Sequence, residues 1–276
     1  MSKIYKDNPT NRRLNRVGKP YGYVAPSTTK QCPEGKILNP RSQRCVNENG
    51  KIGKALLKSP RTPKLKVNQF KTFKQGQAEV DIYQKFYNKQ EADSIFKELS
   101  KLKFEDSYVK IYGKKKMPRK MLWFSDNKDW TYVFSKNHIN GLKAHKFTKL
   151  LNKIREKVEK ETKQKFNSLL INYYESGQNS VNWHNDDDPW LGENFMVPSL
   201  SFGGERNFLI KENKKGAKSE KILLKHGSMI VMKEMTQKSH IHSVPKTKQN
   251  VGPRINLTFR NVVPELVFKQ PKPAVE

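Results

Sequence analysis

His184 and Asp186 are the residues whose types and spacing best suit metal chemistry. They are two positions apart, so in an extended segment their side chains leave the same face and can chelate one ion. A third ligand is available further along the chain, from His240 or His242. Two imidazoles and one carboxylate on one side of a metal form a facial triad, which leaves positions on Fe(II) for a bidentate cosubstrate and dioxygen. By itself the tripeptide is weak evidence, because most His-x-Asp sequences are surface polar residues.

Two segments with strand periodicity direct polar side chains toward one cavity. In residues 254–260 polar and apolar residues alternate, and the polar face carries Arg254, Asn256, Thr258 and Arg260. The same alternation in residues 169–174 sets Asn172 and Tyr174 on one face. Guanidinium groups bind carboxylates through paired hydrogen bonds, so two arginines on one face suit a small dicarboxylate. The alternative for either strand is a solvated antiparallel face.

The motifs around these residues follow one another in the order INYY, WHNDDDP, SLSFGGERNFLIK, HGSMIVM, HSVPK and PRINLTFR. This succession closely resembles the AlkB-type family of Fe(II)- and 2-oxoglutarate-dependent dioxygenases that repair alkylated nucleic acids. It is most similar to the animal DNA-repair branch, and the resemblance extends from about residue 80 to residue 263. The combination of ordered motifs is specific, although each motif alone is not.

The resemblance implies roles for individual residues. It implies that His184, Asp186 and His242 bind the iron, with His242 preferred to His240 because the family places this ligand directly before Ser and a hydrophobic-Pro pair. The residues implied to contact 2-oxoglutarate are Asn172, Tyr174, Arg254 and Arg260, to which the shared strand face adds Asn256.

The region of about 104–135 is expected to recognise nucleotides. Basic residues, among them Arg119, alternate here with aromatic ones, and this combination suits phosphate contact with base stacking. A hairpin with buried aromatic side chains is the alternative. The resemblance implies that Tyr112 wedges into the duplex and that Phe124 stacks on the flipped base. It also implies that Asp187 and Asp188 lie beside the damaged base.

The composition favours a polyanionic partner. The formal net charge is +29, from 55 Lys and Arg against 26 Asp and Glu, which suits nucleic acid first and an anionic membrane surface second. A lysine-rich composition typical of an AT-rich genome is the alternative source of part of this excess. No apolar run reaches the 18 residues of a membrane span, and the N-terminus has no secretory h-region. We therefore expect an intracellular monomer, located in the nucleus, a viral factory or a virion, that does not act on membranes.

Residues 1–66 are expected to form a basic and largely flexible arm, which precedes a dioxygenase domain of residues 67–276. The arm contains Cys32 and Cys45, which cannot complete a zinc site without other ligands, so either a disulfide or a reduced pair remains. The segment of about 32–57 resembles the two-cysteine adaptor module found in proteins of large DNA viruses. This resemblance implies a viral enzyme with a protein-docking module.

The expected fold is mainly β with flanking helices (α+β), around a double-stranded β-helix, the cupin-like jelly roll. Asn88 to Glu91 has the spacing of a capping box and begins an amphipathic helix. A second helix is indicated by apolar residues at helical spacing from residue 147 to 158. The expected strands are 167–174, 197–202, 206–211, 220–225, 227–233, 239–244 and 254–262, a spacing that suits a double-sheet jelly roll.

Together these features predict an oxidative demethylase of DNA that uses Fe(II), 2-oxoglutarate and dioxygen. The expected lesions are of the 1-methyladenine and 3-methylcytosine type, and the products are the restored base, formaldehyde, succinate and CO2. Two alternatives stay open: an RNA or protein demethylase of the same family, and a non-catalytic nucleic-acid-binding relic.

Overall fold

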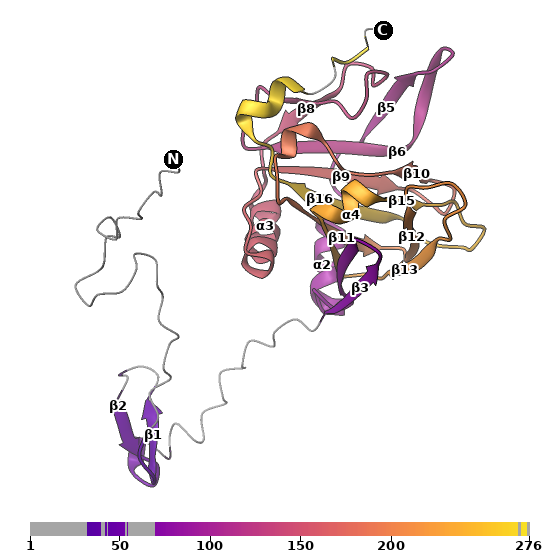
Figure 1. Ribbon diagram of the computed structural model, residues 1–276. Coiled ribbons are helices and arrows are strands. Elements are labelled where there is room, and N and C mark those ends of the chain that lie inside the picture. Colours follow the sequence, from indigo (N-terminus) through magenta and orange to yellow (C-terminus); the bar gives the residue numbers. More distant parts are fainter. Residues whose placement is uncertain are drawn as a thin grey trace, which may run out of the picture. The chain divides into compact units, whose positions relative to one another are not determined.

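The computed structural model describes residues 32–39, 42, 44–52, 54, 70–269 and 272–274 (Figure 1). The chain divides into two units, residues 1–66 and 67–276. Most of the predicted flexible arm, and the linker expected at residues 59–66, lie outside the described residues.

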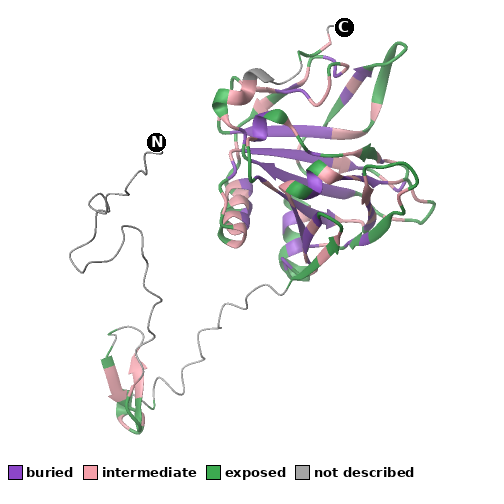
Figure 2. Cartoon of the chain, in the orientation of Figure 1, coloured by how far each residue is buried: buried purple, intermediate pink, exposed green. Residues whose placement is uncertain are grey.

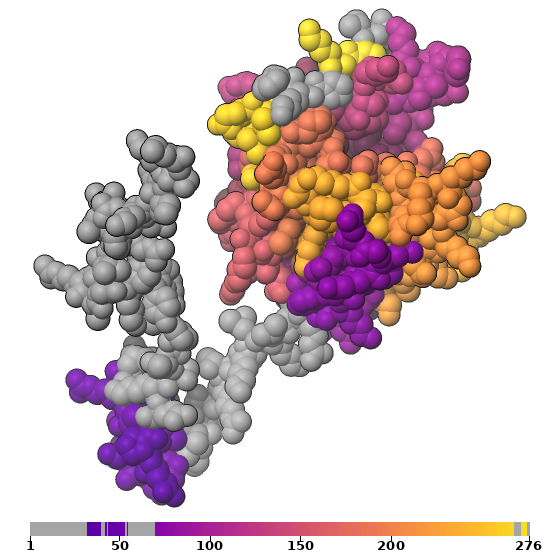
Figure 3. All heavy atoms as spheres, in the orientation of Figure 1, coloured from indigo at the N-terminus to yellow at the C-terminus, as the bar shows by residue number. Residues whose placement is uncertain are grey.

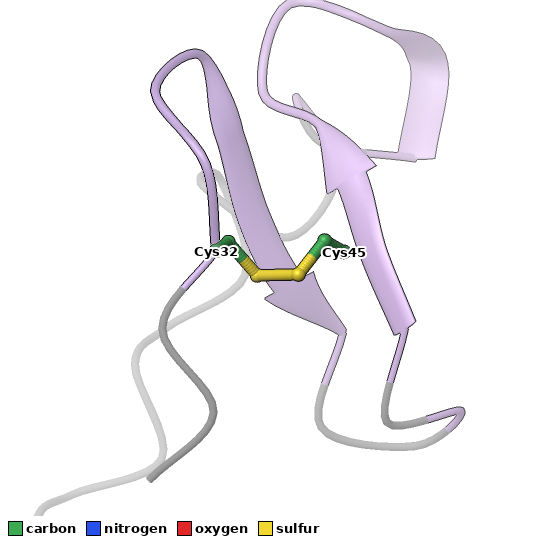
Figure 4. Close-up of a disulfide and its surroundings, with 2 residues drawn as sticks. All are labelled: Cys32 and Cys45. Carbon is green, nitrogen blue, oxygen red and sulfur yellow. A yellow bond between two sulfur atoms is a disulfide. The ribbon is translucent and has the colours of Figure 1, made fainter.

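The described part of the N-terminal unit is a β-hairpin closed by a disulfide. Strand β1 (Lys36–Asn39) pairs antiparallel with β2 (Arg44–Asn47). Cys32 and Cys45 are bonded, with their Cα atoms 5.6 Å apart (Figure 4). Of the two states that the sequence left open for this pair, the structure therefore contains the disulfide.

The second unit is built on two facing β-sheets. The large sheet has the strand order β3 (Lys71–Gln75), β4 (Ala78–Tyr83), β14 (Ser228–Lys233), β11 (Met196–Gly203), β16 (Arg254–Arg260), β9 (Ser168–Tyr174), β6 (Lys114–Ser125), β8 (Leu142–His145) and β7 (Thr131–Tyr132), and β5 (Glu105–Lys110) pairs with β6. The small sheet has the order β10 (Val181–His184), β15 (His240–Val244), β12 (Arg206–Glu212) and β13 (Glu220–Leu224). The predicted double-stranded β-helix is confirmed, and each of the seven expected strands is present with its ends shifted by at most two residues.

Two helices cover the outer face of the large sheet (Figure 1). Helix α2 (Lys89–Leu99) begins at Asn88, whose side chain accepts from the backbone N–H of Glu91 while the Glu91 carboxylate accepts from that of Asn88, so the predicted capping box is confirmed. Helix α3 (Lys149–Thr162) confirms the second amphipathic pattern. The apolar stripes of both helices pack on the outward side chains of β9, β11 and β16, which leaves the opposite face of these strands free to line a site.

A second apolar core lies between the two sheets. It combines large-sheet residues such as Met121, Trp123 and Ile230 with small-sheet residues such as Phe208 and Ile210. The strands at the centre of the large sheet are therefore buried on both faces, and they are purple in Figure 2. The solvated antiparallel face kept as an alternative for β9 and β16 is wrong, because these strands lie in the middle of a covered sheet.

Helix α4 (Glu234–Ser239) is short and follows β14 directly, and no pattern in the sequence predicted it. Its N-cap residue, Lys233, makes no side-chain cap hydrogen bond, so the usual start signal is absent. The helix is held instead by Thr236, which accepts from the backbone N–H of Glu79 and donates to its carbonyl oxygen. In Figure 3 the β3–β4 hairpin, indigo to purple, lies against the orange segment that includes α4. The remaining short elements are the 3-10 helices η2 (Pro189–Leu191) and η3 (Pro264–Lys269).

Candidate metal centre and cosubstrate cavity

The structure brings His184, Asp186 and His242 together at one end of the small sheet. His184 is the last residue of β10 and lies opposite His242 of β15 in the antiparallel register. Asp186 follows two residues after His184, and the potential ligand atoms of the three side chains all lie within 4.8 Å of one another. His240, the alternative third ligand, does not belong to this cluster: it is buried and its Nδ1 contacts the Ser239 hydroxyl at 2.7 Å.

Hydrogen bonds prepare these side chains to bind a cation. The Nδ1 of His184 lies 2.8 Å from the carbonyl oxygen of Asn182, which can only accept, so Nδ1 carries the proton and Nε2 is free for a metal. The Nε2 of His242 lies 3.6 Å from a carboxylate oxygen of Asp186. The ring of His242 stacks on Phe208 with their centroids 5.0 Å apart, which fixes its orientation.

The protonation states also suit a metal. Burial lowers the pKa of His184 to about 4, with a further contribution from His242, so the imidazole is neutral at neutral pH. Burial raises the pKa of Asp186, but the charge of Arg260 and the contact with His242 outweigh it and hold this pKa well below its usual value. The cluster therefore offers a neutral imidazole and an ionised carboxylate, the donor set that Fe(II) takes in a facial triad.

Two neighbours hold Asp186 in place. Arg260 donates a hydrogen bond to its Oδ1, and Gln237 accepts from its backbone N–H at 2.9 Å. Gln237 is fully buried and belongs to α4. The sequence patterns did not point to Gln237, since α4 itself carries no clear start signal.

A cavity of about 490 Å³ opens beside the three ligands, between the two sheets. Its polar wall is the predicted face of β16 and β9, which contributes Asn172, Tyr174, Arg254, Asn256, Thr258 and Arg260. The register explains this grouping, because Arg254 pairs with Tyr174 and Asn256 with Asn172. All the candidate cosubstrate contacts thus line one cavity with the metal cluster.

Arg254 and Arg260 both keep Nε and Nη1 without a hydrogen-bond partner among the described residues. Arg260 is paired with the carboxylate of Asp186, whereas the described residues offer no carboxylate to Arg254. The side chain of Arg254 is 1% exposed, and its Nη2 donates to the Ser201 hydroxyl at 2.9 Å. A buried guanidinium with free donors is costly unless an anion pairs with it, so this position calls for a carboxylate.

The two asparagines of the wall differ. Asn256 donates from Nδ2 to the Ser199 hydroxyl and to the carbonyl of Leu200, and its Oδ1 accepts from Thr258. Its amide is therefore largely used in holding β16 to β11. Asn172 has one such contact, accepting from the Nε of Arg119 at 2.7 Å.

The residues expected to bind substrate are not all found at the cavity. Arg119 and Asp188 line it, and burial raises the pKa of Asp188 to about 7. Asp187 is exposed and is not part of the lining. Tyr112 is fully exposed, with a positive φ of 48°, in the turn between β5 and β6. Tyr112 thus projects from the tip of the β5–β6 hairpin and is not buried as the alternative required, and its expected contact with the duplex stays a prediction.

Phe124 does not lie where a stacking ring is needed. It is 4% exposed and belongs to the core under the helices, where its ring lies 6.2 Å from that of Phe147. Side chains alternate along β6, so Leu122 and Phe124 face the helices while Met121 and Trp123 face the other sheet. The expectation for Phe124 is corrected by this geometry.

The aromatic side chains that do line the cavity are Tyr132 and Phe134. Phe134 stacks on the buried ring of His138, with centroids 4.0 Å apart, and Tyr132 lies 5.5 Å from the guanidinium of Arg260. The sequence contained a signal for them, because Trp130, Tyr132 and Phe134 follow at period two.

Two facing, mainly antiparallel sheets that hold a His-Asp-His cluster beside a buried, unpaired guanidinium define a mononuclear iron oxygenase with a carboxylate cosubstrate. The comparisons agree with this class. Residues 79–260 match the model of the 2OG-Fe(II) oxygenase superfamily. The chain therefore belongs to this superfamily and, by its similarity to the proteins named next, to the AlkB-type branch. It is an Fe(II)- and 2-oxoglutarate-dependent dioxygenase, which confirms the predicted enzyme class and cofactors.

The chain is 34% identical over 197 residues to the DNA oxidative demethylase ALKBH2 of Bos taurus, covering 66% of this chain and 68% of that protein. It is 32% identical over 203 residues to the alpha-ketoglutarate-dependent dioxygenase alkB homolog 3 of Mus musculus, covering 69% of this chain and 68% of that protein. The solved structure of OsALKBH1 matches with a TM-score of 0.51 and 16% identity over 70% of this chain and all of that one, which supports the fold. Within the described residues, no helix combines the length and the apolar character that crossing a membrane requires.

Proposed function

We propose that this enzyme removes N-methyl groups from bases of DNA, with 1-methyladenine and 3-methylcytosine as the lesion type. The methyl carbon leaves as formaldehyde, while 2-oxoglutarate is converted to succinate and CO2. The observation that carries the proposal is the cavity of about 490 Å³, which is lined both by the His-Asp-His cluster and by the unpaired Arg254. The names of the ALKBH2 relatives support DNA as the substrate.

In this proposal His184, Asp186 and His242 hold the Fe(II), which when bound supplies the activation of dioxygen. Arg254 would bind a carboxylate of 2-oxoglutarate through Nε and Nη1, which have no other hydrogen-bond partner among the described residues. Its burial to 1% exposure excludes water from that pair and strengthens it.

Arg260 has a different task, because it is already bonded to Asp186 and lies 3.8 Å from Asp188. It keeps Asp186 ionised and oriented toward the metal, and the Tyr132 ring beside it excludes water. We therefore assign Arg260 to positioning the ligand. Its Nε and Nη1 have no hydrogen-bond partner among the described residues, so Arg260 also keeps donors for the expected contact with 2-oxoglutarate, alongside Arg254.

The target base must leave its stack to reach the cavity, which costs least when methylation already blocks its pairing. Phe134 and Tyr132 offer aromatic surface on the cavity wall, so they replace Phe124 as candidates for contact with the base. Arg119 lines the same cavity, and the β5–β6 hairpin carries the run Lys114 to Lys116 and the exposed Tyr112. These residues suit a phosphate backbone that passes the mouth of the cavity.

Turnover of defined oligonucleotides tests the proposal. Single- and double-stranded DNA with one 1-methyladenine or one 3-methylcytosine should be restored to the unmodified base, detected by mass spectrometry, with formaldehyde released in equal amount. RNA of the same sequence tests the RNA alternative, and methylated peptides test the protein alternative. Binding of DNA without repair by the Fe(II)-loaded enzyme would favour the non-catalytic relic.

For residues 1–66 we propose contact with DNA. This segment contains 16 Lys and Arg against Asp7, Glu34 and Glu48, and none of the candidate iron or 2-oxoglutarate residues. The resemblance to a viral two-cysteine module supports the competing proposal, a docking function around the disulfide hairpin. The salt dependence of DNA binding separates the two, because only a segment that neutralises phosphates contributes to it.

A further inference from the structure

Trp183 is an exposed tryptophan at the mouth of the cavity. It directly precedes the ligand His184 and lines the cavity, yet 40% of its surface is exposed, whereas Trp123 and Trp190 are almost completely buried. An indole offers a large flat surface for stacking, and the position of Trp183 beside a binding cavity makes that surface available to a ligand.

A contact with Lys211 shows which way this ring points. His242 pairs with both His184 and Ile210, and these side chains face the interior between the sheets. Lys211 is next to Ile210, so it lies on the outer face of the small sheet. Strand β10 is irregular between Val181 and His184, so the position of Trp183 follows from its contact with Lys211 and not from alternation. The ammonium of Lys211 is 4.7 Å from the centroid of the Trp183 ring. Trp183 thus offers an aromatic surface at the mouth of the cavity, with a positive charge against it.

The surroundings of this pair are basic. Lys221 lies on the same outer face, since it pairs with Leu209, which is two residues before Lys211. An exposed ring next to positive charges suits a nucleobase with its phosphate, because the ring accepts a stacked base of any sequence while the ammonium groups neutralise the backbone. A protein partner would gain less from the charges and would find a small apolar area here.

We propose that Trp183 and Lys211 form a stacking site for the unpaired nucleotide that flanks the target base. This inference rests on the proposed function. When the target base turns into the cavity, the neighbouring base loses its stacking partner, and the indole replaces it. In a duplex the neighbouring base is held by pairing and cannot reach the outer face of the sheet. The site therefore favours single-stranded DNA.

The test compares Trp183→Ala and Trp183→Phe with Leu223→Ala, a matched control that removes another exposed apolar side chain of the small sheet, 39% exposed. On a single-stranded oligonucleotide with one 3-methylcytosine, Trp183→Ala should raise KM about tenfold, the loss of ~1.4 kcal/mol of stacking, and should change kcat less than about twofold. Trp183→Phe should recover most of the loss, and Leu223→Ala should behave as the wild type. On the matching duplex, the KM of Trp183→Ala should change less than about twofold.

Binding of an unmodified single strand supplies a measurement that does not depend on repair. Trp183→Ala should raise its Kd about tenfold. An oligonucleotide with abasic sites in place of the bases that flank the target should bind the wild type about tenfold more weakly than the intact oligonucleotide does. Trp183→Ala should bind these two oligonucleotides with the same Kd. Lys211→Ala, which leaves β10 untouched, should lower the slope of log Kd against log salt by about 0.7.

An unchanged Kd and KM in Trp183→Ala would overturn the inference, and so would an equal effect of the abasic sites on wild type and variant. Equal losses on single strand and duplex would also overturn it. If the proposed function were wrong, the wild type would repair none of the methylated oligonucleotides. The Kd values of the wild type and Trp183→Ala for the unmodified single strand would still show whether the stacking site exists.

Discussion

Replacing Arg254 with Ala separates cosubstrate binding from folding. The guanidinium is 1% exposed and makes one bond, to Ser201, while Nε and Nη1 have no partner among the described residues. Truncating one partner of a buried, hydrogen-bonded charge pair costs about 2 to 5 kcal/mol, so the KM for 2-oxoglutarate should rise roughly 30- to 5,000-fold. Arg254→Lys should recover only part of this, because an ammonium cannot form the planar two-bond contact.

Arg206 provides a matched control for Arg254. It is also buried, at 3% exposure, and its guanidinium lies 5.7 Å from the Tyr174 ring, which is 4.9 Å from the guanidinium of Arg254. Unlike Arg254, it donates to three backbone carbonyls, those of Ser176, Asn179 and Pro245. Arg206→Ala should therefore lower the free energy of unfolding by about 2 to 5 kcal/mol, because three partly buried carbonyls lose their donor. Its KM for 2-oxoglutarate should stay close to that of the wild type.

The assay for Arg254→Ala and Arg206→Ala combines the KM for 2-oxoglutarate with thermal unfolding in the presence of Mn(II), which occupies the metal site without turnover. Addition of 2-oxoglutarate should raise the Tm of the wild type and of Arg206→Ala, but not that of Arg254→Ala. Without cosubstrate, Arg254→Ala should unfold near the wild-type Tm, because the loss of the hydrogen bond to Ser201 is offset by the removal of a buried charge that has no carboxylate partner among the described residues. If Arg254→Ala kept the wild-type KM and still gained stability from 2-oxoglutarate, our interpretation of the unpaired guanidinium would be wrong.

Three further predictions concern the metal ligand, a buried histidine and the N-terminal unit. Asp186→Ala should lose Fe(II) binding and repair, while affinity for unmodified DNA changes little; a fully active variant would exclude the metal assignment. Burial lowers the pKa of His138 to about 4, so the folded protein keeps this imidazole neutral while the unfolded chain protonates it below about pH 6.5. The free energy of unfolding should therefore fall by about 3 kcal/mol in total as the pH drops from about 6.5 to about 4. In His138→Gln the free energy of unfolding, measured with urea, should depend less on pH between about 6.5 and about 4. An unchanged pH dependence would contradict the lowered pKa of His138. Removal of residues 1–66 should leave kcat on a short oligonucleotide intact but lower the salt slope for long DNA by about 0.9 for each phosphate that the shortened protein no longer neutralises; identical slopes would favour protein docking.

Much of the fold follows from patterns that are local in the sequence. The capping box at Asn88 and the apolar spacing of α2 and α3 depend on neighbours within one or two helical turns. Alternation in residues 254–260 separates the polar face of β16 from its apolar face, and the structure places the polar face in the cavity. The ordered motifs singled out His184, Asp186 and His242 as the cluster that the fold assembles.

Which face of a strand meets which neighbour was decided by tertiary structure. Phe124 and Phe134 are both aromatic residues in alternating segments, but the helices cover the first while the second faces the cavity. Asp187 and Asp188 are adjacent and identical in type, yet Asp188 alone lines the cavity. The support of Asp186 by Gln237 depends on a contact across 51 positions of sequence. Periodicity divides side chains into two sets but does not say which set meets the other sheet, because that depends on strand pairing between residues far apart in the chain.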